Sequence, residues 1–562
     1  MRNIIQHKQL FFWGVFLLLS LVLSFVHYRV DLTSEKRYSL SEPSKKLMKK
    51  LDFPLKVKIY LDGSLNSGFL RLKKSTVEML EELKVYSSKP IAIEFEDPSS
   101  VVKPEEREKH YAELESRGLT PTNVYERDND GKIIRKTIFP WLEMEYKGRK
   151  VLVNLLKNIP GNSGDENLNI SIIELEYEIT DAVRRLVNTS VDKIAFLEGH
   201  DELSEAATYD ISKSLSRYFQ IDRGRIGNDA SILHPYKVVI VAKPQLPFSE
   251  KEKLIIDQYI MNGGKVLWLI DGVRLAEENF SVTGTSPAIP LDLNLSDLLF
   301  RYGIRIKPVI LQDVQCAQMP VNVAKTKEAP HFEPLPWFFA PLLLTSYAHP
   351  VTRNLATVRS EFCSAIDLVG ENQQVSAVLL LATSDNTHVI GTPTTVDLRD
   401  MPSANDKNYF NTGYVPVGVL LEGNFESVFT NRMLPDSVVN ISSIRPVSVN
   451  TKQIFVADGD IIKNEISIVQ GDSIYLPLGF DRLTGLQYGN RDFIENAVLY
   501  LADDEGWMQL KNKTLKLRLL NRQVVYDQKL KWQLVNVLLP LVILAIFGFV
   551  FQLIRKRKFT RS

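Results

Sequence analysis

The sequence has very little cysteine, with only Cys316 and Cys363 among 562 residues. A framework of disulfide bonds therefore cannot stabilise the fold, although a single bridge between the two stays open. No Cys-x-x-Cys pair occurs, which excludes thioredoxin-type redox chemistry. Neither cysteine lies near a tight turn after a central strand, where a hydrolytic nucleophile is expected. We expect both to be small buried hydrophobic residues.

A large net charge and a nucleotide-binding motif are also missing. The formal net charge is +1, whereas nucleic-acid-binding domains usually carry a clear basic excess, so no nucleic-acid partner is expected. No Gly-x-x-x-x-Gly-Lys-Ser/Thr motif is present, so the chain cannot hold nucleotide phosphates as a P-loop ATPase does. A process that consumes ATP must therefore be driven by another protein.

Apolar residues are concentrated at both ends of the chain. Residues 10–26 contain no charge, and the bulky side chains of Phe25, Val26 and His27 stand at the end of the run, where a signal peptidase needs small ones. We therefore predict an uncleaved transmembrane helix at residues 10–27 rather than a removed signal. Residues 534–554 are also uncharged, and a helix of that length crosses a bilayer core of about 30 Å. The sequence predicts one transmembrane helix at each end.

The charges beside these spans predict their orientation. Residues 555–562 form a basic tail that includes Arg555, Lys556 and Arg557, and positive flanks stay in the cytoplasm. With two spans, residues 1–9 are cytoplasmic as well, and the bulk of the chain lies in the periplasm, outside the bacterial inner membrane. Asn536 and Pro540 add or free polar groups within the second span. They predict either contact with another membrane subunit or a mild kink in an isolated helix.

Between the spans, residues 192–272 have the pattern of a complete α/β unit. Three continuous apolar runs, at residues 193–197, 238–242 and 265–270, alternate with helical patterns. One helical pattern spans residues 203–218, and another begins at a capping box formed by Ser249 and Glu252. Continuous apolar strands separated by helices indicate a parallel sheet covered on both faces. We therefore predict a central Rossmann-like domain over residues 191–290.

A chain of this length is expected to form two to four domains. Residues 30–190 predict an N-terminal α/β domain that contains a β-α-β unit, with strands near residues 55–61 and 91–95 around a helix. Residues 291–530 predict a mixed, strand-rich region with a proline-rich loop at residues 320–341. The predicted fold class is multidomain α/β and α+β.

Two groups of polar residues are candidates for ligand binding. Glu198, His200, Asp201 and Glu202 follow the first central strand, and α/β domains bind ligands at the carboxyl ends of their strands. They could form a metal or acid-base site, although polar loop residues are common there without such a role.

The second candidate group, Asp458-Gly459-Asp460, offers two carboxylates to a cation. Asp-Gly is first of all a turn signal. The spacing of a complete metal site is absent from both groups, and the sequence assigns no metal, cofactor or catalytic residue.

Several segments resemble the GldG family, an auxiliary, often substrate-binding-like component of gliding-motility ABC transporters. The resemblance follows the order of nearly the whole chain and includes the basic tail. Its segments are residues 195–200, 421–432, 456–460, 478–482 and 496–501.

The resemblance implies a gliding bacterium of the Bacteroidetes type and a non-catalytic subunit that works with a separate permease and ATPase. It also implies similarity of the central domain to class I glutamine amidotransferases, although no cysteine stands where that fold places its nucleophile. A membrane-anchored hydrolase or transferase that uses residues 198–202 stays open as the alternative function.

Overall fold

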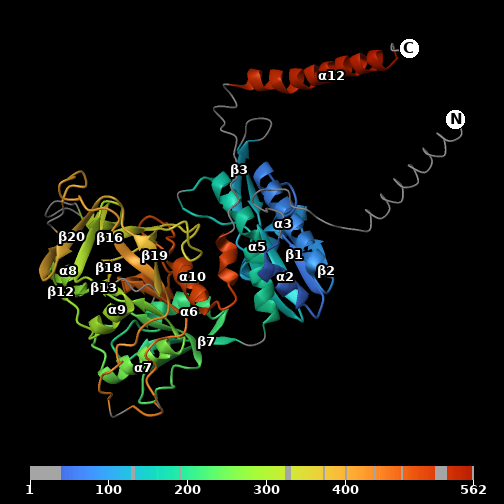
Figure 1. Cartoon of the computed structure of the whole chain (residues 1–562). Helices are drawn as coiled ribbons and strands as arrows, with labels where there is room; N and C mark the ends of the chain where they lie inside the picture. The colour runs from blue at the N-terminus through green and yellow to red at the C-terminus, as the bar shows by residue number, and fades with distance from the viewer. Residues whose placement is uncertain are drawn as a thin grey trace. The chain divides into compact units, whose positions relative to one another are not determined.

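The structure is a computed structural model, and two compact units, Met1–Lys513 and Thr514–Ser562, divide it. The residues that it describes are 40–127, 133–160, 162–188, 191–322, 331–370, 374–398, 402–435, 438–441, 443–469, 472–512 and 528–559. The predicted N-terminal span, residues 10–27, lies outside them. The described chain is a mixed α/β structure with several sheets (Figure 1).

The first part of the larger unit is built on a four-stranded sheet with the order β2-β1-β5-β6. Its strands are β1 (Leu55–Ile59), β2 (Ile91–Phe95), β5 (Trp141–Tyr146) and β6 (Arg149–Asn154). The helices are α2 (Glu42–Lys49), α3 (Ser67–Tyr86), α4 (Pro104–Ser116) and α5 (Gly164–Val187). Strands β1 and β2 are parallel and joined through α3, which confirms the predicted β-α-β unit.

Helices cover both faces of this sheet. Helices α2, α3 and α5 pack on one another, and α5 packs on β5 and β6. On the other face, Tyr111 and Leu114 of α4 form a separate buried cluster with Tyr60, Leu119 and Phe139. Alternating strand residues thus serve two cores, as the pleat of a strand requires.

The second part is built on a ten-stranded sheet with the order β15-β16-β19-β22-β23-β10-β9-β7-β8, in which β17 also pairs with β16. The five strands β8, β7, β9, β10 and β23 run parallel, and the rest pair antiparallel. The parallel strands are β7 (Asp192–Glu198), β8 (Phe219–Arg225), β9 (Tyr236–Ala242), β10 (Lys265–Leu269) and β23 (Thr451–Val456). The others are β15 (Cys316–Asn322), β16 (Phe332–Thr345), β17 (Val358–Arg359), β19 (Val375–Ala382) and β22 (Pro416–Gly423).

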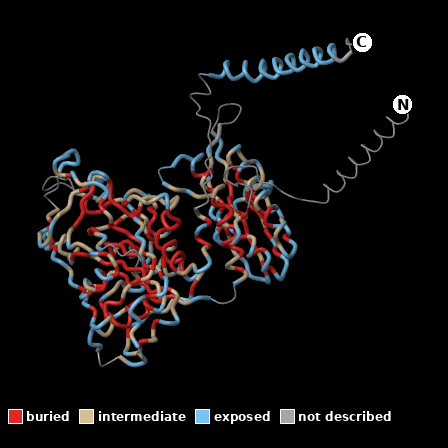
Figure 2. The backbone as a smooth tube through the Cα atoms, viewed as in Figure 1, coloured by how far each residue is buried: buried red, intermediate tan, exposed pale blue. Residues whose placement is uncertain are grey.

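Strands β7, β9 and β10 are buried on both faces, as their continuous apolar sequences predict, whereas the edge strand β8 is largely polar. In β9, Val238 and Ile240 belong to one core, and Val239 and Val241 belong to the other. Helices α6 (Tyr209–Leu215) and α10 (Asn490–Ala502) contribute to the first core, and α7 (Glu250–Met261) and α9 (Ser296–Tyr302) to the second. In Figure 2 the buried residues of these cores are the red segments of the backbone tube.

Short elements complete the larger unit. They are β3 (Thr122–Arg127), β4 (Ile133–Ile138), β11 (Val273–Leu275), α8 (Glu278–Thr283), β12 (Thr285–Pro290), β13 (Ile304–Ile306), β14 (Val309–Asp313), β18 (Ile366–Leu368), β20 (Thr387–Gly391), β21 (Thr394–Asp397), β24 (Ile466–Val469) and β25 (Asp472–Tyr475). Both cysteines are free, and Cys363 is buried whereas Cys316 is only partly so.

Two local predictions are wrong. The helix predicted over residues 203–218 is shorter, because α6 begins at Tyr209 after a 3-10 turn at Ala206–Thr208. The predicted proline-rich loop at residues 320–341 contains the end of β15 and the first part of β16 in its described residues. The prolines lie where β16 pairs with the edge strand β15, a position that tolerates the missing N–H group.

The smaller unit contains helix α12 (Lys529–Phe559). It is the one helix among the described residues that is long and apolar enough to cross a membrane. Its residues as far as Arg557 are exposed along the helix (Figure 2). Length and composition thus agree with the predicted second span.

Candidate functional site

The parallel strands of the large sheet end at a common edge, which is where α/β sheets bind ligands. Strand β7 ends at Glu198, β9 at Ala242, β10 at Leu269 and β23 at Val456. The polar residues that follow these strand ends form two separate groups.

The first group surrounds His200, whose side chain is only 4% exposed. Its Nδ1 lies 2.9 Å from Oε1 of Glu202, and its Nε2 lies 3.3 Å from Oε2 of Glu252. The ring stacks on Phe248 with centroids 3.7 Å apart. Burial alone would lower the pKa of His200, but the two carboxylates outweigh it, and the pKa lies above its usual value. The two acidic side chains therefore favour the protonated form of His200.

The His200 group also connects two elements of the fold. Glu252 belongs to the predicted capping box of α7, in which its carboxylate accepts the N–H of Ser249 at 2.9 Å and Ser249 caps the helix. The imidazole thus joins the end of β7 to the first turn of α7.

The other two candidates beyond β7 lie apart from this pairing. Glu198 accepts a hydrogen bond of 2.8 Å from Arg223 Nε on β8. Asp201 is exposed and has a left-handed backbone with φ of 59°. A ligand-binding role for Glu198, His200 and Asp201 stays a prediction.

The second group, called the aspartate cluster here, consists of Asp271, Asp458 and Asp460. One oxygen from each lies within 4.8 Å of the others. The ammonium group of Lys243 forms an ion pair with Asp460 and lies 3.8 Å from Asp271. The predicted Asp458–Asp460 pair is thus joined by a third carboxylate and a lysine, from β10 and β9, that the sequence did not indicate.

Backbone groups hold the cluster in place. Asp458 accepts N–H bonds from Glu361 at 3.0 Å and from Asp460 at 2.8 Å. Asp271 accepts the N–H of Gly459 at 2.6 Å. The carboxylates therefore fasten the ends of β10 and β23 to each other and to the chain at Glu361.

Mutual repulsion and burial set the protonation of the cluster. Burial raises the pKa of Asp458 well above its usual value, and the charges of Asp460 and Asp271 raise it further. Burial also raises the pKa of Asp271 to about 6, although Lys243 opposes the shift. Three carboxylates are ligands of the type that Mg²⁺ and Ca²⁺ take. Because Lys243 already supplies a positive charge there, a metal ion would have to displace its ammonium group.

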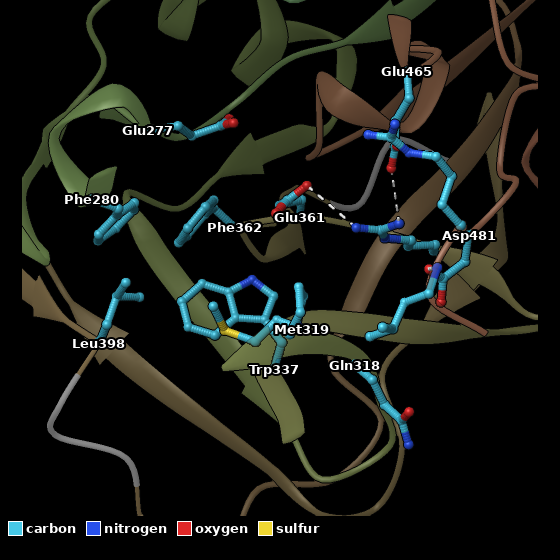
Figure 3. Close-up of a pocket in the computed structure, with 14 residues that line it drawn as sticks. Glu277, Phe280, Gln318, Met319, Trp337, Glu361, Phe362, Leu398, Glu465 and Asp481 are labelled. Carbon is cyan, nitrogen blue, oxygen red and sulfur yellow. Dashed lines mark hydrogen bonds and ion pairs between the residues drawn. The ribbon is translucent and has the colours of Figure 1, made fainter. Parts of the chain in front are cut away.

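A pocket of about 660 Å³ lies beside the aspartate cluster (Figure 3). Three aromatic rings, called the aromatic wall here, line it: Phe280 of α8, Trp337 of β16 and Phe362 after β17. Glu361, whose N–H binds Asp458, and Glu277, which lies 3.7 Å from Lys243, line it as well. Sequence reasoning missed this pocket, because its residues come from segments far apart in the chain and share no motif.

The residues predicted to contact a membrane partner lie in the smaller unit. Pro540 lies inside α12, and Asn536 lies one turn before it. Both are exposed on the helix. Their contact with another subunit stays a prediction.

Comparisons with known proteins place the chain in a family. The profile described as "ABC-type uncharacterized transport system", an auxiliary-component family, matches residues 192–497. A profile described as a domain of unknown function (DUF7088) matches residues 34–145. An uncharacterized protein of Borreliella burgdorferi is 20% identical over 551 residues, which cover 94% of each chain. The solved mmIFT52 N-terminal domain covers 56% of this chain and 98% of that domain, with 14% identity and a TM-score of 0.32.

The first profile spans the whole region that supplies the large sheet, from β7 through β23, and ends within α10. It also contains the two polar groups and all of the pocket residues. Because that match covers more than half of the sequence, the chain belongs to the ABC-type transport system family and is an auxiliary component of a transporter.

Proposed function

We propose that this protein is a non-catalytic auxiliary subunit of an ABC transporter required for bacterial gliding motility. It is anchored in the inner membrane by a helix at each end, and residues 30–530 lie in the periplasm, where they bind a ligand or partner proteins. The partners are a permease and an ATPase. The family match supports association with transporter components, and the sequence resemblance to the GldG family supports the gliding role.

The observation that carries the membrane part of this proposal is helix α12. It is apolar and exposed throughout its described length as far as Arg557. Leaving such a surface in water is strongly unfavourable, since burial of apolar area contributes about 25 cal/mol per Å². Arg555, Lys556 and Arg557 close the helix, and this cationic end favours the cytoplasmic side.

The second span serves as more than an anchor in this proposal. One span would suffice to retain the protein at the membrane, whereas two limit how the periplasmic part faces a partner and raise its effective concentration there. Asn536 and the carbonyl group freed by Pro540 offer polar contacts that another membrane helix can satisfy.

A helix replacement tests the partnership. Residues 534–554 are exchanged for an unrelated apolar helix with the basic tail retained, and permease and ATPase recovered with the protein from native membranes are measured by mass spectrometry. We expect normal insertion but reduced recovery of both subunits and impaired gliding. The matched control is the same replacement helix with the asparagine and the proline restored at positions 536 and 540, which should recover part of the binding. Full recovery and full motility with the plain replacement would show that the span is only an anchor.

A reporter enzyme that is active only outside the inner membrane tests the topology. It should be active when inserted at the exposed Lys147–Gly148 turn between β5 and β6. It should be inactive when fused after Ser562, because five cations of the tail would otherwise cross the bilayer. An active C-terminal fusion contradicts the two-span arrangement.

A further inference from the structure

The aromatic wall forms an apolar surface of three closely packed rings in the pocket. The centroids of Phe280 and Phe362 are 5.8 Å apart, and Trp337 lies 5.9 Å from Phe362 and 6.4 Å from Phe280. Trp337 and Phe362 meet edge to face, and so do Trp337 and Phe280. The rings come from three segments that the fold brings together, and in Figure 3 Phe280 and Phe362 lie side by side above Trp337, with Glu361 next to Phe362. Such a set of ring faces can attract a cation through the ring quadrupole.

The lining of the pocket carries more acidic than basic groups. Four carboxylates and two guanidinium groups line it. Both arginines are directed to one carboxylate: Arg482 Nε lies 3.0 Å from Glu465, and Arg359 Nη1 lies 3.7 Å from it. The lining thus has two more acidic than basic groups, and Lys243 and Lys463, which do not line the pocket, each lie 3.7 Å from Glu277.

Glu361 is the acidic group of the lining that stands next to Phe362 of the aromatic wall. Its carboxylate has one ion-pair partner among the described residues, Arg359, at the outer limit of 4.0 Å. The side chain is 31% exposed and is labelled near the centre of Figure 3, beside Phe362 and above Trp337. Burial, together with the charge of Glu277, raises the pKa of Glu361 to about 7. A cation beside this carboxylate would supply the partner that the chain does not.

We propose that this pocket binds a ligand through an alkylammonium group, which lies against the aromatic wall and pairs with Glu361. A cation is favoured over an anion because both arginines already serve Glu465. It is favoured over an uncharged molecule because only a cation gains from both Glu361 and the ring faces. The volume of about 660 Å³ admits a ligand larger than the ammonium group alone. This assignment deepens the ligand-binding part of the proposed function and rests on it.

Titrations of the full-length protein in an uncharged maltoside detergent test the assignment. The probes are choline, ethanolamine and 3,3-dimethylbutan-1-ol, which has the shape of choline but no charge. Binding is followed by isothermal titration calorimetry. We expect a cation to bind at least about fivefold more tightly than the uncharged probe, in line with cation–π and ion-pair energies of about 1 kcal/mol or more. Absent cation binding, or equal affinity for choline and its uncharged analogue, would overturn the proposal.

Variants locate the binding in this pocket. Glu361→Gln keeps the shape of the side chain and should weaken cation binding about tenfold, whereas Phe362→Leu should weaken it a few-fold. The matched control is Glu426→Gln, because Glu426 is a surface carboxylate that pairs with Arg301 at 2.6 Å and does not line the pocket. Its affinity should match that of the unmodified protein. Unchanged binding in Glu361→Gln, with the same heat of binding, would place the cation elsewhere and overturn the assignment.

Two sources of the ammonium group are distinguished by one more probe. Dihexanoylphosphatidylcholine, used below its micelle concentration, carries the group as a lipid headgroup. Tighter binding of this lipid than of choline identifies a headgroup ligand, and the reverse identifies a free alkylammonium solute.

Recovery of permease and ATPase with Glu361→Gln is measured in parallel. Loss of cation binding with normal recovery separates this site from the role in the transporter complex.

Discussion

The aspartate cluster and the neighbouring pocket place negative charge in opposite settings. In the cluster, Asp458 accepts two backbone N–H bonds, and Lys243 serves Asp460 and Asp271. In the pocket, Glu361 has a single ion-pair partner at 4.0 Å within the described chain. The two settings meet at one residue, since the N–H of Glu361 is itself bound by Asp458.

The carboxyl groups of the aspartate cluster support the fold, whereas the carboxyl group of Glu361 is available to a ligand. Burying a carboxylate is costly, and the cost is offset only when cations and N–H groups are fixed around it. The cluster has a lysine and three backbone N–H groups fixed around its carboxyl groups, and so it fastens the sheet edge. Glu361 does not meet that condition, and so a ligand cation can improve its surroundings. The following changes test this contrast.

Removing the lysine of the cluster should have the largest effect. Lys243→Met leaves Asp460 and Asp271 without their shared cation, and breaking a buried ion pair costs about 3–5 kcal/mol. We expect a large drop in the urea midpoint of the full-length protein in detergent, followed by circular dichroism. Lys251→Met is the control, because Lys251 on α7 is only partly buried and its ammonium group donates to the amide oxygen of Asn228 at 2.9 Å. A midpoint unchanged in Lys243→Met would show that the cluster does not support the fold.

Removing the central acceptor should have the next largest effect. Asp458→Ala leaves the N–H groups of Glu361 and Asp460 without their acceptor, at about 1–3 kcal/mol for each buried donor. Thermal unfolding followed by circular dichroism should show a lower midpoint. Asp458→Asn retains one acceptor oxygen and should lose less. Equal losses in the two variants would contradict a role based on hydrogen bonding.

The His200 group should give a pH-dependent effect of intermediate size. The pKa of His200 lies above its usual value, so its stabilising contribution is complete below the unfolded-state pKa and is lost as the pH rises through the folded-state pKa. The facing groups are Glu202, Glu252 and the ring of Phe248. His200→Gln should therefore cost roughly 2 kcal/mol at pH 6, from two charge-assisted hydrogen bonds, and less at pH 9. Thermal unfolding at the two pH values measures the difference, and an equal loss at both would contradict a protonated His200.

Neutralising Glu361 should have the smallest effect on stability. Its pKa is raised to about 7 by burial and by Glu277 and Asp460, against Arg359 and Lys463. Its favourable contribution is therefore present below its unfolded-state pKa and is lost as the pH rises through about 7.

Ionising the Glu361 carboxyl in the folded protein costs free energy at high pH, and Glu361→Gln removes that cost. The variant should therefore be within about 0.5 kcal/mol of the unmodified protein at pH 5 and relatively more stable at pH 8. Unfolding midpoints at these two pH values provide the measurement. A destabilisation as large as that of Asp458→Ala would mean that Glu361 supports the fold, and the contrast between cluster and pocket would fail.

Local features of the parallel sheet could be predicted from the sequence because local chemistry encodes them. The continuous apolar residues of β9 and β10 indicate strands buried on both faces, and Ser249 with Glu252 marks the first turn of α7. Strand β8 was missed because it is largely polar and lies at the edge of the sheet, so no apolar run marks it.

The candidate sites were only partly predictable. Position after a strand end pointed to His200, and two carboxylates around one glycine pointed to Asp458 and Asp460. Neither pattern indicated the partners Glu252, Lys243 and Asp271, which other segments supply. The aromatic wall has no local signal at all, because its rings meet only after α8, β16 and the chain after β17 have packed. A single sequence shows the chemistry of each side chain, but it does not show which distant side chains the fold brings together.

The pairing of β10 with β23 has a consequence for biosynthesis. The hydrogen bond between Trp268 Nε1 and Gln453 Oε1 joins positions 185 residues apart, and β10 and β23 lie side by side in the sheet. During synthesis, the edge of β10 therefore waits for a strand that emerges much later, while unpaired strand edges promote association between chains. The nascent protein should depend on chaperone protection over that interval, and truncation before residue 451 should yield an aggregation-prone fragment rather than a smaller folded domain.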